Sequence, residues 1–303
     1  MEYRAAMDLG GTHCRFYLES MDGAFLGEFS GAGCTLNLNG YAQTKKTIGK
    51  TVFDALNHSG LTPGECRGFV CAASGADTPE LENEYLNMMC ELGFNRCFVR
   101  VYNDCAVFLA HCEKPALLIA SGTGSILWAC DGHGRLLRYG GWGHLTSDEG
   151  SAFSIALKAL SSVTKHLDGE GQAPLLTSLI AEKAGLKDQN AITRFAYDNI
   201  LNKSRIAALA PLVFQAAEAG DPEAGRLIEE AAQALMHGSE ILSRNSESFS
   251  EIYLWGSLLV QSPLLSGRLK EMLGIKFPSA IVKVPDKSAL QTAMDIARSL
   301  ISK

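Results

Sequence analysis

The chain has 303 residues, of which 47% are hydrophobic and 20% are charged, and its formal net charge is −6 at pH 7. This balance is typical of a globular protein with one large domain or two medium ones. Lysine and arginine form no cluster longer than a pair, which argues against nucleic-acid binding. No apolar run reaches the length of a membrane span, and the first residues lack signal-peptide anatomy. We therefore expect a cytoplasmic protein.

Nine cysteines lie between Cys14 and Cys130. None of them are spaced C-x-x-C, so the usual zinc-site and redox patterns are missing. Several, such as Cys71 and Cys130, lie in apolar strand-like runs. We expect buried free thiols in a reducing compartment.

The chain begins with a strand, a Gly/Thr turn, a second strand, an Asp-Gly turn at Asp22-Gly23 and a third strand. Helix-like and strand-like segments then alternate, and the predicted order is βββαβαβ. The expected elements are a helix over 41–58, a strand over 67–74, a helix over 79–93, a strand over 97–104 and a helix over 105–112.

Residues 117–143 repeat the design of residues 7–33. Each segment has an apolar strand, a Gly/Thr turn, a second strand, an Asp-Gly turn, a third strand and a glycine-rich exit. Asp131-Gly132 occupies the place of Asp22-Gly23. Two hairpin units of one design indicate a duplicated fold with one unit per domain.

The second half of the chain is predicted to be mostly helical. Asp221-Pro222 has the form of a helix start, with an N-cap residue followed by proline. No low-complexity linker separates the halves, so we expect them to pack closely with a cleft between them. The expected elements are helices over 150–165 and 174–245, a strand and turn over 250–259, a strand over 280–285 and a closing helix over 288–301.

Glycine-rich turns follow the first strand of each hairpin unit. Glycine lets backbone N–H groups approach an anion closely, and Thr or Ser hydroxyls add donors. One such turn is weak support for a site, but two at equivalent places can hold a polyphosphate from both sides of a cleft. Asp8 precedes the first turn, and its carboxylate suits that place if Mg²⁺ lies between it and the phosphate. A simple turn-forming role is its alternative.

Asp104 comes at the end of the predicted strand over 97–104. The carboxyl ends of strands border the crevice in which α/β sheets bind ligands. Asp104 can therefore accept a proton from a substrate hydroxyl that attacks a γ-phosphate. It can also serve as N-cap of the helix expected after it. No Walker A motif and no G-x-G-x-x-G after a strand is present.

The loop over 140–152 reads GGWGHLTSDEGSA. Ser147 or Asp148 makes a good N-cap for the following helix, and acidic residues such as Asp148 and Glu149 suit the positive end of a helix dipole. Trp142 between glycines has few neighbours of its own, and flat aromatic rings suit sugar faces. The loop is therefore either a capped helix start or a ligand-binding loop.

These motifs resemble the N-acetylglucosamine kinase group of the BadF/BadG/BcrA/BcrD ATPase family, within the sugar kinase–Hsp70–actin superfamily. The resemblance covers nearly the whole chain, and the 140–152 loop is its most specific part. It implies duplicated ribonuclease H-like (actin-like ATPase) α/β domains with a cleft between them. The segments that carry it are MDLGGTHCRFYL, CTLNLNG, YNDCA, IASGTGS, GGWGHLTSDEGSA, AGDPEA, WGSLL and ALQTAMDIA. The expected domains are residues 1–113 with the helix 288–303, and residues 114–287.

The resemblance also implies a role for each matching position, with ATP and Mg²⁺ as cofactors. Asp104 matches the catalytic base, which also binds the sugar, and Asp8 lies near the metal. The positions that match ATP-binding residues are Gly10, Gly11, Thr12, Gly122, Thr123, Gly124, Gly256 and Ser257. The positions that match sugar-binding residues are Asn37, Asp104, Gly141, Trp142 and Asp148, and Asn39 competes with Asn37 on the same local pattern.

The chain departs from the family pattern in two places. Ala208 stands where a glycine often lies beside the nucleotide, and Gln291-Thr292 replaces a small glycine pair. The implied activity is ATP-dependent phosphorylation of an amino sugar, N-acetylglucosamine or glucosamine, at the 6-hydroxyl, by a homodimer that binds neither nucleic acid nor membrane. The alternatives are an ATPase that activates a 2-hydroxyacyl-CoA dehydratase-type enzyme, and a non-catalytic sugar sensor.

Overall fold

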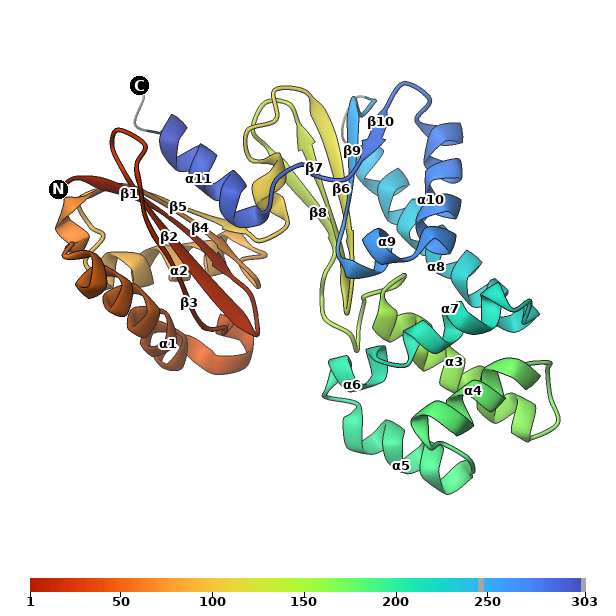
Figure 1. Cartoon of the computed structure of the whole chain (residues 1–303). Helices are drawn as coiled ribbons and strands as arrows, with labels where there is room; N and C mark the ends of the chain where they lie inside the picture. Colours follow the sequence, from red (N-terminus) through yellow and green to blue (C-terminus); the bar gives the residue numbers. More distant parts are fainter. Residues whose placement is uncertain (245–247, 301–303) are drawn as a thin grey trace. The chain divides into compact units, whose positions relative to one another are not determined.

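The structure is a computed structural model that describes residues 1–244 and 248–300. The chain forms two compact units (Figure 1). Unit 1 comprises Met1–His111 and the segment from Pro285 onward, and unit 2 comprises Cys112–Val284. No helix in the described ranges is long and apolar enough to cross a membrane.

Unit 1 is built on a five-stranded sheet with the order β3-β2-β1-β4-β5. The first three strands are antiparallel neighbours, whereas β1, β4 and β5 run parallel. Asp22-Gly23 turns the chain between β2 and β3, as predicted. The strands are β1 (Tyr3–Leu9), β2 (His13–Ser20), β3 (Phe25–Ala32), β4 (Cys66–Ala73) and β5 (Phe98–Asn103).

Helices cover both faces of this sheet (Figure 1). Alternate residues of the strands point to opposite faces. Met7 therefore joins a core with α1 and α2, while its neighbour Ala6 joins a smaller core with α11. Arg298 of α11 forms an ion pair with the buried Glu19 of β2. The helical segments are α1 (Leu36–Ser59), η1 (Pro63–Glu65), α2 (Pro79–Glu91), η2 (Ala106–Leu109) and α11 (Ala289–Ser299).

Unit 2 repeats the sheet of unit 1. Its order is β10-β9-β6-β7-β8, in which β10, β9 and β6 run parallel and β6, β7 and β8 are antiparallel neighbours. Read from the third strand of each hairpin unit, both sheets have the order third, second, first, fourth, fifth. The duplication predicted from the two hairpin units is therefore confirmed. The strands are β6 (Pro115–Ser121), β7 (Ser125–Asp131), β8 (Leu136–Gly140), β9 (Glu251–Trp255) and β10 (Ile281–Lys283).

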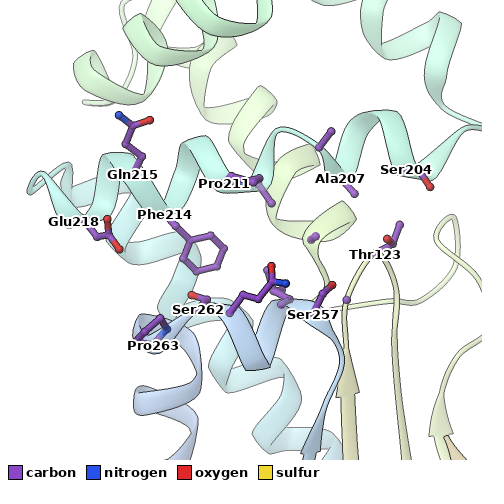
Figure 2. A pocket seen from close by; sticks show the side chains of 16 residues that line it. Thr123, Ser204, Ala207, Pro211, Phe214, Gln215, Glu218, Ser257, Ser262 and Pro263 are labelled. Carbon is purple, nitrogen blue, oxygen red and sulfur yellow. The ribbon is translucent and has the colours of Figure 1, made fainter. Parts of the chain in front are cut away.

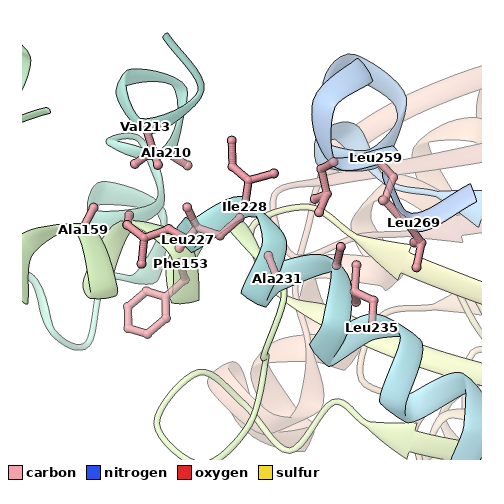
Figure 3. Packing of buried hydrophobic residues seen from close by; sticks show 14 of the residues in the cluster. Phe153, Ala159, Ala210, Val213, Leu227, Ile228, Ala231, Leu235, Leu259 and Leu269 are labelled. Atoms are coloured by element: carbon pink, nitrogen blue, oxygen red, sulfur yellow. The ribbon is translucent and has the colours of Figure 1, made fainter. Parts of the chain in front are cut away.

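The main core of unit 2 lies around α8. Figure 3 shows Leu227, Ile228, Ala231 and Leu235 of this helix between apolar side chains of α3 and of α9 and α10, and all of them are buried in one cluster. Asp221 caps α8, as predicted, by accepting from the N–H groups of Glu223 and Ala224. The helices are α3 (Ala152–Leu167), α4 (Pro174–Ala184), α5 (Gln189–Asn199), α6 (Lys203–Ala207), α7 (Ala210–Glu218), α8 (Pro222–Ser243), α9 (Ser257–Gln261) and α10 (Pro263–Lys276).

Two expected helices differ in the structure. The helix predicted over 41–58 begins earlier, at Leu36, and Gly40 interrupts it with non-helical backbone angles. The helix predicted over 105–112 is only a short 3₁₀ turn, η2. The ends of two other predicted helices, at residue 245 and residue 301, lie outside the described residues.

Candidate active site

The polar residues predicted in unit 1 gather at one edge of its sheet. Because β1, β4 and β5 are parallel and in register, Leu9, Ala73 and Asn103 end their strands side by side. The loops that follow carry Gly10, Gly11 and Thr12 after β1, residues 74–78 after β4, and Asp104 after β5. This is the edge at which parallel α/β sheets place ligands.

Asp104 does not cap a helix, contrary to one expected role. The side-chain oxygen of Asn103 takes that place, because it accepts hydrogen bonds from the N–H groups of Cys105 at 2.8 Å and Ala106 at 3.1 Å. Burial, reinforced by the negative charges of Asp77 and Asp8, raises the pKa of Asp104 to about 6. A carboxylate with that pKa accepts a proton more readily than an ordinary aspartate does and is still ionised at neutral pH.

Asp77 belongs to the same group, and the sequence analysis missed it. It lies after β4, and its Oδ1 accepts a hydrogen bond of 2.6 Å from Asn103 Nδ2. Asn103 thus joins the loops after β4 and β5. The available signal was an acidic residue three positions beyond the predicted strand over 67–74, in a loop without a recognised motif.

Asp8 lies on β1, one residue before the end of the strand, and its Oδ2 accepts from Arg15 Nη2 at 2.6 Å. Thr12 in the following turn is exposed, and its hydroxyl lies 2.9 Å from the Nδ1 atom of His13. The Gly10 N–H donates to the His13 carbonyl and closes the turn. The turn therefore presents Gly11 and Thr12 to solvent.

Asn37 and Asn39 have different surroundings. Asn39 Oδ1 accepts from the N–H of Thr35 at 2.9 Å, so it is used within the helix start. Asn37 is exposed, and its Nδ2 lies 3.6 Å from the place that a Cβ on Gly75 would occupy. Asn37 is therefore beside the loop that leads to Asp77, and of the two residues it is the better placed to bind a ligand.

The glycine turns predicted in unit 2 meet each other at the end of its sheet. Gly122, Thr123 and Gly124 follow β6, and Gly256 follows the parallel neighbour β9. Gly256 has φ +93°, and a Cβ there would lie 2.3 Å from the Ser121 carbonyl oxygen, so only glycine fits.

A pocket of about 460 Å³ opens beside these turns, within unit 2 (Figure 2). That volume is in the range of small-molecule sites. The hydroxyls of Thr123, Ser204 and Ser257 lie toward one side, and Phe214 projects into it from α7. Ala208 lines the pocket, whereas Gln291 and Thr292 lie on α11 in unit 1. The lining residues are Gly122, Thr123, Ala152, Ser204, Ala207, Ala208, Ala210, Pro211, Phe214, Gln215, Glu218, Ser257, Leu258, Gln261, Ser262 and Pro263.

The helix that follows the loop over 140–152 is not capped as predicted. Ser151, rather than Ser147, Asp148 or Glu149, is the N-cap of α3, and its hydroxyl accepts from the N–H of Ser154 at 3.2 Å. Ser151 adopts the extended backbone that an N-cap requires, whereas Asp148 has φ +71°. Asp148 is buried and free of capping duty.

Trp142 and Gly141 lie in the same loop, directly after β8. The Trp142 side chain is 70% exposed, and the Arg138 guanidinium lies 4.2 Å from its ring centroid. Trp142 is therefore not a core residue. A ring held by a cation on one side and open to solvent is suited to stacking on a flat ligand.

The predicted site residues thus form two sets. Unit 1 carries one at a single sheet edge: Asp8, Gly10, Gly11, Thr12, Asn37 and Asp104. Unit 2 carries the other, around its pocket and the loop before α3: Gly122, Thr123, Gly124, Gly141, Trp142, Asp148, Gly256 and Ser257.

Curated relatives match most or nearly all of the chain. An N-acetylmuramic acid/N-acetylglucosamine kinase from Clostridium acetobutylicum is 27% identical over 306 residues, which cover 99% of each chain. An N-acetyl-D-glucosamine kinase from Dictyostelium discoideum is 29% identical over 189 residues, or 59% of each chain.

Solved structures share the fold. A candidate N-acetylglucosamine kinase from Chromobacterium violaceum has a TM-score of 0.75 at 25% identity and covers 98% of this chain and 99% of its own. A ROK-family glucokinase from Streptomyces griseus, with glucose and AMPPNP bound, has a TM-score of 0.54 at 16% identity. The predicted duplicated α/β fold of the actin-like ATPases is confirmed. The profile of one family matches residues 7–294, and the chain belongs to the BadF/BadG/BcrA/BcrD ATPase family.

Proposed function

We propose that the protein is an ATP-dependent kinase that phosphorylates an amino sugar, N-acetylglucosamine or glucosamine, at its 6-hydroxyl. The observation that carries this proposal is Asp104. It lies where the parallel strands β1, β4 and β5 end, Asn103 rather than Asp104 accepts from the N–H groups of Cys105 and Ala106, and burial raises the pKa of Asp104 to about 6. The amino-sugar kinases among the relatives support the substrate class.

In the proposed reaction Asp104 accepts the proton of the sugar hydroxyl as the hydroxyl oxygen attacks the γ-phosphorus of ATP. The bond from that phosphorus to the β-bridging oxygen breaks, and ADP leaves. We assign the nucleotide base to the unit 2 pocket, where Phe214 and Pro211 offer apolar surface. We assign phosphate contacts to the turn at Gly122–Gly124 in unit 2 and to the turn at Gly10–Thr12 in unit 1.

The donor set fits Mg²⁺ carried by a nucleotide. Among the described residues no three His, Cys, Asp or Glu side chains are grouped to hold an ion. Mg²⁺ typically uses one or two carboxylates together with phosphates and water. We assign the protein carboxylate to Asp8, and the ion would neutralise charge on the phosphate oxygens.

We assign sugar contacts to Asn37, Gly141, Trp142 and Asp148 as well as Asp104. Trp142 supports this assignment because its ring is exposed. A homodimer in the cytoplasm is part of the proposal, and light scattering tests the oligomeric state.

The decisive experiment compares wild type with Asp104→Asn in an ADP-release assay on glucosamine, N-acetylglucosamine, N-acetylmuramic acid and N-acetylmannosamine. We expect wild type to turn over at least one of the first two, with phosphate on the 6-oxygen by NMR. Asp104→Asn should lower kcat by about 10²–10⁴-fold. Asp54→Asn, an exposed change on α1, is the control and should be neutral.

The pH dependence gives a second readout. Asp104 must be ionised to accept a proton, so kcat/KM of wild type should fall with slope one below about pH 6 and level off above it. Near-wild-type turnover by Asp104→Asn would contradict the assignment of the base. Iron in the purified protein would instead favour the dehydratase-activator alternative.

A further inference from the structure

The buried Asp148 carboxylate accepts a hydrogen bond from the backbone N–H of Ser125, but only one of its two oxygens is paired in this way. It is 3% exposed, and its Oδ2 makes no hydrogen bond with the described residues. A buried charge is costly unless it is paired. The cation beside it is Lys203, whose Nζ lies 3.8 Å from Asp148 Oδ2.

The Asp148 charge attracts the Lys203 ammonium group but does not occupy its N–H donors. A separation of 3.8 Å is too long for a direct hydrogen bond, and an ammonium group has three N–H donors. The Lys203 side chain is 44% exposed. It therefore has donors available for a ligand.

The ammonium group lies against the glycine turn of unit 2. A Cβ on Gly124 would lie 3.1 Å from Lys203 Nζ and 2.7 Å from Asp148 Oδ2. The absence of a side chain at Gly124 is what lets the pair approach the turn. Lys203 also begins α6, which contributes Ser204 and Ala207 to the pocket next to this turn (Figure 2).

The pocket itself has no cation. Among the residues that line it, Glu218 alone is charged, and it is an acid. A ligand with several negative charges gains nothing from that lining. A positive charge placed beside Gly124, at the edge of the pocket, supplies what the lining lacks.

We propose that Lys203 is a nucleotide-binding residue that contacts the β- or γ-phosphate at the Gly124 turn, and that Asp148 is the positioning residue that holds its ammonium group there. This inference rests on the proposed ATP site and adds a residue to it. Asp148 then serves both the sugar loop and, through Lys203, the phosphate site.

The test measures binding of ADP, ATP and adenosine by calorimetry, without sugar. Lys203→Met should weaken ADP and ATP by about tenfold or more, as expected for a lost contact between a cation and phosphate. Adenosine should bind within about twofold of wild type, because it lacks phosphate. Lys203→Arg keeps the charge and should lose less. The control Lys187→Met removes an exposed lysine of the loop between α4 and α5.

A double variant separates phosphate binding from simple neutralisation of Asp148. Asp148→Asn with Lys203→Met removes both charges, so it also avoids leaving a buried carboxylate unpaired. We expect its ADP affinity to stay as weak as that of Lys203→Met. Recovery of wild-type ADP affinity, or an equal loss of adenosine binding in Lys203→Met, would overturn the inference.

The outcomes also distinguish this inference from the proposed function. Wild type that binds ADP but phosphorylates no sugar would contradict the proposed kinase activity. The ADP affinity of Lys203→Met would then still test the role of Lys203. Wild type that binds no adenine nucleotide would overturn both. Unchanged ADP affinity in Lys203→Met, with normal sugar turnover, would overturn the inference alone.

Discussion

Asp77 shows how one side chain sets the chemistry of another at the unit 1 sheet edge. It binds Asn103, which orders the turn around Asp104, and its negative charge is the second cause, after burial, of the raised pKa of Asp104. Asp77→Asn keeps an oxygen for Asn103 but removes the charge. Loss of a like charge favours the ionised form of Asp104.

We therefore expect Asp77→Asn to lower the pKa of Asp104 and to move the acidic limb of kcat/KM to lower pH, with the plateau near wild type. The measurement is the pH profile of sugar phosphorylation from pH 4.5 to 8. Glu84→Gln, an exposed change on α2, is the matched control and should leave the profile in place. A loss of rate at all pH values without a shift of the limb would show that Asp77 only supports the fold.

The raised pKa of Asp104 also predicts a cost in the stability of the fold. The folded-state pKa of Asp104, about 6, lies above the ordinary value of 3.8, so its ionised form is disfavoured by folding. This penalty is absent below pH 3.8, grows as pH rises, and is complete above pH 6. Asp104→Asn should therefore raise the free energy of unfolding at pH 8 by about 1–3 kcal/mol and should lose that advantage near pH 4. Urea denaturation at the two pH values measures this, and an equal effect at both would contradict it.

At the scale of elements, the N-terminus of α3 tests which residue caps it. The Ser151 hydroxyl is buried and accepts from the Ser154 N–H, whereas Ser147 lies four residues before this N-cap. Ser151→Ala should cost about 1 kcal/mol of unfolding free energy, as lost N-caps do. Ser147→Ala should change it by less than about 0.5 kcal/mol. Thermal or urea denaturation distinguishes the two, and equal costs would contradict the assignment.

The turn at Gly256 joins β9 to α9 and lies against the end of β6. Gly256→Ala would place a residue with a side chain at φ +93°. Its Cβ would collide with the Ser121 carbonyl. We expect a loss of more than about 2 kcal/mol of unfolding free energy, or no folded protein. Gly267→Ala on α10 is the matched control with the opposite sign, because no atom lies near its Cβ and alanine favours a helix.

The sequence predicted the two hairpin units and their order because period-two strands and Asp-Gly turns are local signals. It failed at two places. The predicted helix over 105–112 is only the short η2, although Asn103 accepts from the N–H groups of Cys105 and Ala106 at its start. The importance of Asp77 depends on the register of β4 and β5, which no local pattern shows. The roles of the predicted site residues stay predictions until the variants above are measured.

At the scale of the whole molecule, the chain builds one sheet design twice and puts different chemistry on each copy. The copy in unit 1 ends in carboxylates at its strand ends, whereas the copy in unit 2 ends in two glycine turns and a pocket. Each unit has its own buried core. The two units therefore share one sheet architecture, and the loops after the strands give each unit its own chemistry.

This organisation predicts that ADP stabilises the two units unequally. The pocket lies wholly in unit 2, and a ligand stabilises what it binds by about 2.7 kcal/mol at 100 times its Kd. The chain offers a separate probe for each unit. All three tryptophans, Trp128, Trp142 and Trp255, lie in unit 2, whereas seven of the nine cysteines, Cys14 to Cys105, lie in unit 1.

Tryptophan fluorescence and thiol labelling during heating should therefore respond differently to saturating ADP. We expect the fluorescence midpoint to rise by about 5–10 °C, from the usual scaling for a unit of this size, and the midpoint of thiol exposure to rise by less, because each core can unfold by itself. Lys203→Met is the control and should reduce the fluorescence shift at the same ADP concentration. Equal shifts of both probes would show that the units unfold as one, since stabilisation of either would then protect both.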